Sequence, residues 1–413
     1  GLTGSYPFAA KAAGLEFDEL VNRMLDVAVK RYFGQNFTSS KALISFPEEN
    51  NHLKIKSYLR NRQPRYLEML KIFVNTNTYV RNLEGVNRLS TMIKKNLNSL
   101  GFSFQRIQQA EIGNMFFFTN SEDEEFDILL LGNIDNAVRI EEHRYFHETE
   151  QRYFGTGVWQ NKGGLVVMIA ALQALKNCKI LGKCRIGVLL TTDSSIKNKV
   201  SASIIRQKAL QSNSVIGLTG SFLEGGLVTS RSGAATYNIS LNLINNESTS
   251  HVTRMTTLFT KLCSTLCNLS NQEQGILVTP AHLEFNSNIL NVSAHGKMSI
   301  SVRFKHPEQL KAIETKIDKL LPQRKALIDS YIAIGNQRPV MERSENVASL
   351  WKTYKAIADR LDIRLREEHR WSSSDINFVS NEKQKIDGAG PVGTQDEKKQ
   401  EYILKYSLIE RSA

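Results

Sequence analysis

A glycine-rich turn is the part of the sequence whose residue types most clearly indicate a ligand site. Residues 155–164 are GTGVWQNKGG, and the apolar segment LVVMIAALQALK follows directly. Glycines let a backbone approach a bound group closely, yet the middle of this turn, Trp159-Gln160-Asn161, holds no carboxylate, imidazole or thiol. The turn is not a phosphate-binding P-loop, because Lys162 precedes the last two glycines instead of following them. Its shape indicates a site, and its composition leaves the ligand open.

Other polar side chains follow short apolar runs. The runs NMFFFTN, FDILLLGNI, CRIGVLLTT and SVIGLTG are typical of strands that are buried on both faces of a parallel sheet. A helix lies between the second and third runs, which predicts an open α/β sheet. Ligands bind such sheets at the carboxyl ends of the strands. The residues expected there are Asn133 to Asn136, Thr191 to Ser195 and Thr219 to Ser221.

The pattern changes at about residue 234. Alternating and helical segments follow in the order β-α-β-β-α-β, the order of a ferredoxin-like split unit. We therefore predict an N-terminal helical extension over 1–45, an α/β domain made of 46–233 and 338–413, and an inserted lid domain over 234–337. A glycine-proline turn at 388–393 is expected to precede a terminal helix.

Seven motifs in one order resemble the di-zinc exopeptidases, the family of glutamate carboxypeptidase, acetylornithine deacetylase, succinyl-diaminopimelate desuccinylase and aminoacylase. The motifs are DILLLGNIDNAV, GTGVWQNKGGLVVMIAALQAL, VLLTTDSSIKNK, VIGLTGS, LVTSRSGAATYNISL, RWSSSDINF and DGAGPVG. The resemblance implies an α/β domain with a lid that also mediates dimerisation. It implies amide hydrolysis at two zinc ions, which generate a hydroxide while a glutamate shuttles the proton.

The resemblance also implies where the family's metal ligands and base would fall. Here the first histidine position holds Asn133 and the bridging aspartate position holds Gln160. The proton-shuttling glutamate is replaced by Ser194. The remaining ligand positions hold Ser195, Thr219 and Glu397. Neutral amides and hydroxyls neither offset the charge of zinc nor compete with water for it. We therefore expect no di-zinc centre and no cofactor, through either tolerated drift or a cleft recast for another ligand.

Four further residues are candidates for a site. Asp135 remains where the family orients a metal-bound histidine, and Lys162 is its natural new partner. His251 lies where the family's lid carries a histidine that reaches an active site across a dimer. Arg303 matches the family's carboxylate clamp, although it also fits an edge-strand surface charge. The segment SSSD is not a serine nucleophile elbow, which requires Gly-x-Ser-x-Gly.

A separate pair, His143 and His147, lies four residues apart in EEHRYFHETE. The two imidazoles would chelate a metal if the segment were helical. A solvated charged segment is the other interpretation, and the one we favour.

Composition excludes several classes of function. The net charge is +12, but the basic residues are scattered without interleaved aromatic residues, so no nucleic acid is expected. No apolar run reaches the eighteen residues of a membrane span. The four cysteines form no Cys-x-x-Cys pair, which indicates free thiols and a cytoplasmic location. The amphipathic helix LEFDELVNRMLDVAVKRYFG either packs on its own domain or docks on a partner.

The leading hypothesis is a catalytically inactive, peptidase-like protein that binds, scaffolds or regulates. It would dimerise through the lid, with itself or with an active relative, and its cleft would hold an amino-acid or peptide-like ligand. The second hypothesis is a metal-independent amidohydrolase or amide-forming enzyme that uses Asp135, Lys162, Ser194, His251 and Glu397. The third is an active metallopeptidase whose site is displaced to His143 and His147.

Overall fold

The structure is a computed structural model that describes residues 9, 10, 12, 17–33, 47–244, 248–321, 328–335, 337–360 and 363–413. Contacts divide the chain into two units, Gly1–Ile55 and Lys56–Ala413, which are described separately. Among the described residues, no helix is both long and apolar enough to cross a membrane.

The N-terminal helix is present as predicted. It is α2 (Phe17–Phe33), and Met24 and Leu25 on it are exposed. Gly34, the last residue of the predicted segment LEFDELVNRMLDVAVKRYFG, lies outside the described residues. Whether α2 docks on a partner stays a prediction. The two following helices are α3 (Pro47–Asn61) and α4 (Gln63–Asn75), and Pro64 lies in the first turn of α4, where proline is tolerated.

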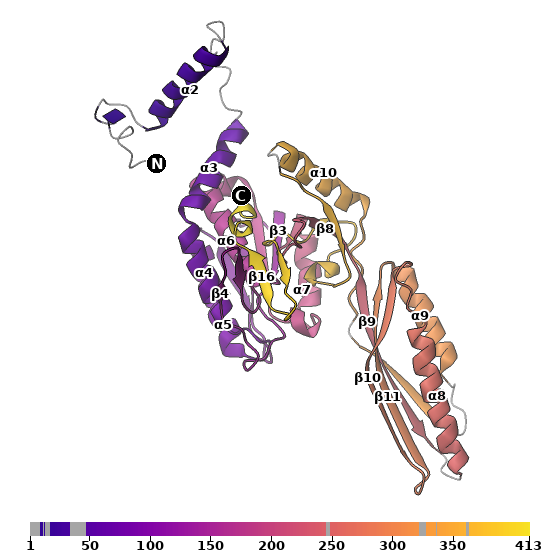
Figure 1. Ribbon diagram of the computed structural model, residues 1–413. Coiled ribbons are helices and arrows are strands. Elements are labelled where there is room, and N and C mark those ends of the chain that lie inside the picture. Colours follow the sequence, from indigo (N-terminus) through magenta and orange to yellow (C-terminus); the bar gives the residue numbers. More distant parts are fainter. Residues whose placement is uncertain are drawn as a thin grey trace. The chain divides into compact units, whose positions relative to one another are not determined.

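A six-stranded sheet forms the centre of the larger unit (Figure 1). Its order is β1-β2-β6-β3-β7-β14, in which β3, β6, β7 and β14 run parallel while β1 and β2 form an antiparallel edge. All six residues of β6 are buried, because both faces of the sheet are covered. The mostly parallel α/β fold is confirmed. The strands are β1 (Ser103–Ile107), β2 (Met115–Thr119), β3 (Phe126–Asn133), β6 (Ile186–Thr191), β7 (Ser212–Gly217) and β14 (Gln384–Ile386).

Helix α6 (Lys162–Asn177) begins in the glycine-rich turn and is buried over most of its length. A Cβ atom on Gly164 would lie 1.8 Å from the carbonyl oxygen of Leu218, so this position requires glycine. The helix therefore lies directly against the chain that leaves β7. The other helices of this part are α5 (Leu83–Ser99), η1 (Leu181–Lys183), η2 (Ser194–Ile196) and α7 (Ser201–Leu210).

A second sheet has the element order predicted for the lid. Strands β9 (Gly233–Leu243), β10 (Ile276–Asn288), β11 (Ser293–Phe304) and β12 (Ile328–Ile334) form an antiparallel sheet of order β10-β11-β9-β12. Figure 1 shows α8 (Thr249–Cys267) and α9 (Pro307–Leu320) side by side on one face of this sheet. Apolar residues of both helices and the strands form one core cluster. The domain boundaries and the lid role stay predictions.

The C-terminal segment differs from the predicted terminal helix. After the glycine-proline turn the chain forms β15 (Gly393–Gln395) and β16 (Glu401–Leu404), and only the last turn, α11 (Ser407–Glu410), is helical. Strand β16 pairs with β5 (Arg152–Phe154), which pairs with β4 (His147–Glu148). Earlier elements are β8 (Leu227–Arg231), α10 (Glu345–Arg360), β13 (Glu367–Arg370) and η3 (Asp375–Phe378).

Candidate functional site

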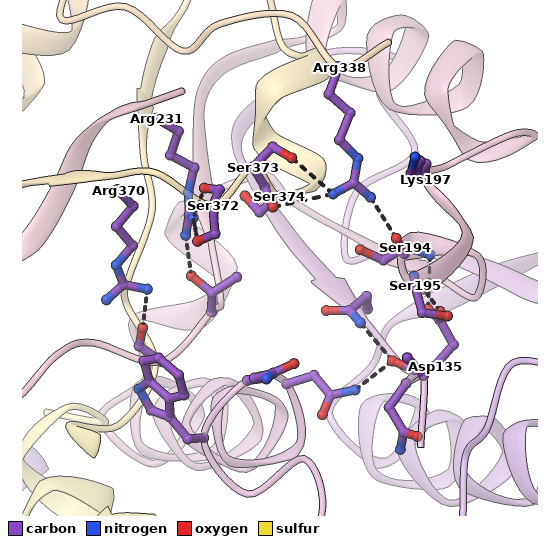
Figure 2. A pocket seen from close by; sticks show the side chains of 18 of the residues that line it. Asp135, Ser194, Ser195, Lys197, Arg231, Arg338, Arg370, Ser372, Ser373 and Ser374 are labelled. Carbon is purple, nitrogen blue, oxygen red and sulfur yellow. Dashed lines mark hydrogen bonds between the residues drawn. The ribbon is translucent and has the colours of Figure 1, made fainter. Parts of the chain in front are cut away.

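A cavity of about 550 Å³ lies at the carboxyl ends of β3 and β6, where the sheet topology predicted a ligand site. Figure 2 shows arginines pointing into it from one side, with Asp135 and Ser195 on the other. Seven of the candidates from the sequence line this cavity: Asn133, Asp135, Gln160, Ser194, Ser195, Thr219 and Arg303.

Three candidates do not line the cavity. Lys162 is buried beneath it, in the first turn of α6. His251 lies in the first turn of α8. Glu397 is exposed in the turn between β15 and β16, and Gln395 lines the cavity instead. The structure therefore does not bring these three residues together with Asp135 and Ser194.

Asp135 is 1% exposed and is held by the backbone that follows β6. Its carboxylate oxygens accept hydrogen bonds from the amides of Ser194 at 3.1 Å and Ser195 at 2.8 Å. Burial raises the pKa of Asp135 to about 6, although these amides act in the opposite direction. Asp135 thus holds in place the loop that carries Ser194 and Ser195.

The predicted partnership between Asp135 and Lys162 is wrong. The ammonium of Lys162 donates to the carbonyl oxygens of Thr76 at 2.8 Å and Val74 at 3.4 Å, at the end of α4. Burial lowers the pKa of Lys162 to about 7, with Glu401 as the opposing charge. Lys162 therefore ties the glycine turn to α4 and does not neutralise Asp135.

The glycine-rich turn encloses the carboxylate of Glu401. Its oxygens accept hydrogen bonds from the amides of Gly157 at 3.2 Å, Trp159 at 3.3 Å and Gln160 at 3.1 Å. Gly157 has a φ of +79°, which glycine adopts without strain. Burial raises the pKa of Glu401, although the hydrogen bonds from these three amides act to lower it. Sequence reasoning missed Glu401, because its segment was predicted to be helical.

The hydroxyl of Ser194 donates a hydrogen bond to a neighbouring carboxylate. Ser194 Oγ donates to Asp375, which also accepts from Thr191 Oγ1 and from Asn198 Nδ2. No histidine is among the residues that line the cavity in the described part of the chain. Ser194 therefore has no imidazole base that would make it a nucleophile.

Thr219 belongs to a buried ion pair. Arg231 and Asp387 lie 2.8 Å apart with side chains 2% and 1% exposed. Thr219 Oγ1 donates to Asp387 at 2.8 Å and accepts from Arg231 at 2.9 Å. Burial alone would raise the pKa of Asp387, but Arg231 and the hydrogen bonds around it hold that pKa below its usual value. The hydroxyl of Thr219 is therefore engaged by Asp387 and Arg231.

The cavity is lined by five cationic side chains and one carboxylate. The carboxylate is Asp135, and the cations are Lys197, Arg231, Arg303, Arg338 and Arg370. Arg231 pairs with Asp387, and Arg370 pairs with Glu368 at 3.4 Å. The other three have no carboxylate within 4.0 Å among the described residues. The side chains that line the cavity therefore include more cations than carboxylates.

This set of donors does not fit two zinc ions. Across the described residues, no three His, Cys, Asp or Glu side chains are grouped as metal ligands. The less favoured alternative, a chelate by His143 and His147, is contradicted because the segment is not helical. His147 lies in β4 and stacks on Phe154, while His143 packs edge-on against Tyr145. The displaced metal site therefore has no geometric basis.

No protein-family model matches the sequence, and no curated protein matches it significantly. The fold, in contrast, matches solved structures. Aminopeptidase PepT from Bacillus cereus aligns over 85% of this chain and 96% of its own, with a TM-score of 0.69 and 14% identity. The M20 family metallo-carboxypeptidase Sso-CP2 from Sulfolobus solfataricus aligns over 84% and 97%, with a TM-score of 0.60 and 12% identity.

A third match is the Bacillus subtilis YXEP protein, a dinuclear metal binding peptidase from the M20 family. It covers 86% of this chain and 96% of its own, with a TM-score of 0.62 and 10% identity. The chain therefore has the fold of the M20 metallopeptidases, as the motifs predicted. At these identities the comparison concerns the fold alone.

Proposed function

We propose that this chain uses a peptidase fold to bind an anionic small molecule and does not hydrolyse peptides at a zinc pair. The observation that carries the proposal is the lining of the cavity, in which five cations face one carboxylate. A zinc site requires anionic or imidazole ligands around the metal. A cleft lined by arginine and lysine instead attracts carboxylates, phosphates and sulfates.

Two arginines contact positions where the family resemblance places the base and a ligand. Arg338 donates from Nη2 to the carbonyl oxygen of Ser194 at 2.6 Å, and Arg231 donates to Thr219 Oγ1 at 2.9 Å. A divalent cation at these positions would meet guanidinium groups, which repel it. The positive charge that metals supply in a di-zinc site comes here from the protein.

Metal analysis of protein purified without chelators tests the proposal. We expect less than one zinc per chain after dialysis against zinc-free buffer, and no change in thermal stability when zinc is added. Two tightly bound zinc ions per chain that disappear in Gln160→Ala or Asn133→Ala would overturn it. Glu150→Ala is the matched control, because Glu150 is exposed and does not line the cavity.

The alternative of a metal-independent amidohydrolase or amide-forming enzyme has weaker support. Asp135 and Ser194 line the cavity, but Lys162, His251 and Glu397 do not. A panel of N-acyl amino acids and dipeptides, assayed with and without added metals, decides between the two. Turnover that survives chelation and is lost in Ser194→Ala would favour the enzyme.

We also propose that the protein dimerises through the edge of the lid sheet at β12. Strand β12 is an edge strand of its sheet, and Tyr331 and Ile334 on it are 64% and 59% exposed. An exposed edge offers free backbone groups for pairing with a second chain. Light scattering of the full chain should give twice the mass of 46.6 kDa, and Ile334→Lys should shift the protein to monomer.

A further inference from the structure

Three cationic side chains, Arg303, Arg338 and Lys197, lie around Ser373 and Thr236. Arg303 Nη1 donates to Ser373 Oγ at 3.2 Å, and Arg338 Nη1 lies 3.4 Å from the same oxygen. Lys197 Nζ donates to Thr236 Oγ1 at 2.7 Å. Thr236 pairs with Ser301 on β11, two residues before Arg303. The three cations therefore come from three separate segments and meet at one end of the cavity.

Among the described residues, no carboxylate lies within 4.0 Å of these three cations, and Asp375, Asp135 and Asp193 act on Arg338 only from beyond ion-pair distance. The two ion pairs of the cavity belong to Arg231 and Arg370. Burial and the neighbouring Arg338 lower the pKa of Arg303, and burial followed by Arg303 and Arg338 lowers the pKa of Lys197. Like charges held together without a counter-ion are unfavourable, and a bound anion relieves the repulsion.

Arg338 is the buried member of the cluster. It is 8% exposed, and its Nε has no hydrogen-bond partner among the described residues. Its Nη2 donates to Ser194 O at 2.6 Å and to Asn198 Oδ1, and its Nη1 donates to Ser373 O at 3.2 Å. These bonds hold the guanidinium beside the loop that carries Lys197 (Figure 2). A buried and pre-oriented guanidinium binds an oxyanion with little loss of conformational entropy.

The charge and the volume select the ligand class. Three unpaired positive charges exceed what one carboxylate neutralises, whereas a phosphate monoester carries close to two negative charges and three acceptor oxygens. A volume of about 550 Å³ suits a small molecule. Trp159, Gln160 and Asn133 line the remainder and would contact its organic part.

We propose that the cavity binds the phosphate group of a small-molecule phosphate monoester through Lys197, Arg303 and Arg338. The inference rests on the proposed function, because a cleft that held two zinc ions would bind phosphate through the metals. It adds to the proposed function the anion class and the residues that select it.

Isothermal titration of the full chain with inorganic phosphate and with acetate, at one ionic strength, tests the inference. We expect phosphate to bind, and to bind about tenfold or more tightly than acetate. Arg303→Met and Lys197→Met should each weaken phosphate binding by about tenfold, because each removes a charged hydrogen-bond donor. Lys199→Met is the matched control, since Lys199 is exposed two residues from Lys197 and does not line the cavity.

The buried Arg338 is left unchanged, so a folding defect does not obscure the result. Phosphate binding that is absent, or that is equal in Arg303→Met, Lys197→Met and the control, would overturn the inference. If acetate or a dipeptide binds and phosphate does not, the inference fails while the proposed function stands. If two zinc ions per chain are found, the proposed function fails, whatever the phosphate affinity.

Discussion

The backbone amide of Gln160 donates a hydrogen bond to Glu401 Oε2 at 3.1 Å. Gly157 and Trp159 donate to the same carboxylate, so the glycine-rich turn binds a side chain of its own protein. Three converging amides form an anion site. Glu401 therefore holds the turn in shape. The side chain of Gln160 is a neutral amide and does not serve as a metal ligand in this account.

Glu401→Ala should destabilise the protein. The substitution leaves three amides without their acceptor and removes the negative charge that stabilises protonated Lys162. We expect a loss of about 2 kcal/mol in the free energy of unfolding, measured by urea titration. Glu397→Ala, an exposed residue of the same hairpin, should change it by less than about 0.5 kcal/mol. Equal effects of the two substitutions would show that the amides do not depend on Glu401.

The contrast between Asp135 and Glu401 shows how far the sequence could predict the site. Asp135 directly follows an apolar run, and the carboxyl ends of parallel strands meet at one edge, so its place in the cleft was predictable. Glu401 lies in a segment whose apolar residues fit a helix, and its strand is defined by pairing with β5, about 250 residues earlier. The sequence pattern around Glu401 contains no information on a partner strand so far away in the chain.

The partner of Lys162 was unpredictable for a similar reason. Charge alone favours Asp135, whereas the structure places the ammonium against the carbonyl oxygens of Val74 and Thr76 at the end of α4. The cluster of Lys197, Arg303 and Arg338 also joins segments that are far apart in the chain. The parallel strands β3, β6 and β7, helix α6 and the β-α-β-β-α-β order, in contrast, follow from local periodicity and were predicted correctly. The run NMFFFTN was also predicted as a parallel strand, which is wrong, because β2 is antiparallel to both of its neighbours.

Removing either partner of the buried ion pair between Arg231 and Asp387 should strongly destabilise the protein. Removing one partner leaves a buried charge without its counter-ion, so Arg231→Met should cost about 3–5 kcal/mol of unfolding free energy. The double variant Arg231→Met/Asp387→Leu should recover part of that loss. Arg185→Met breaks a half-exposed pair with Asp127 and should cost less than about 1 kcal/mol. A double variant no more stable than Arg231→Met would contradict this account.

Stability should rise with pH above neutrality because of two buried lysines. Burial lowers the pKa of both Lys162 and Lys385 to about 7, from the ordinary 10.5. Between these values the unfolded chain keeps a proton that the folded chain has released, so the free energy of unfolding increases with pH. The slope is at most about 1.4 kcal/mol per pH unit for each lysine. Below pH 7 both states are protonated, and this contribution is constant.

Urea titrations between pH 7 and 10 measure this slope. Lys385→Met should reduce it, since Lys385 is fully buried and its ammonium donates to the neutral acceptors Val379 O and Asn381 Oδ1. Lys383→Met, a half-buried lysine two residues away that donates to backbone carbonyls, is the control. An unchanged slope in Lys385→Met would show that this lysine stays protonated in the fold.

Anion binding should strengthen as the pH falls through about 6, because Asp135 is the one carboxylate that lines the cavity. Burial raises its pKa to about 6; the amides of Ser194 and Ser195 oppose the shift, and Asp375 adds to it. Protonation removes a negative charge that repels the ligand and that partly neutralises Arg338.

Sulfate is the suitable probe, since it stays divalent across this range. We expect its Kd at pH 5.5 to be about three times lower than at pH 7.5. Asp135→Asn should abolish this difference, whereas Asp127→Asn, on the surface beside Arg185, should preserve it. A pH dependence that persists in Asp135→Asn would assign the effect to another group.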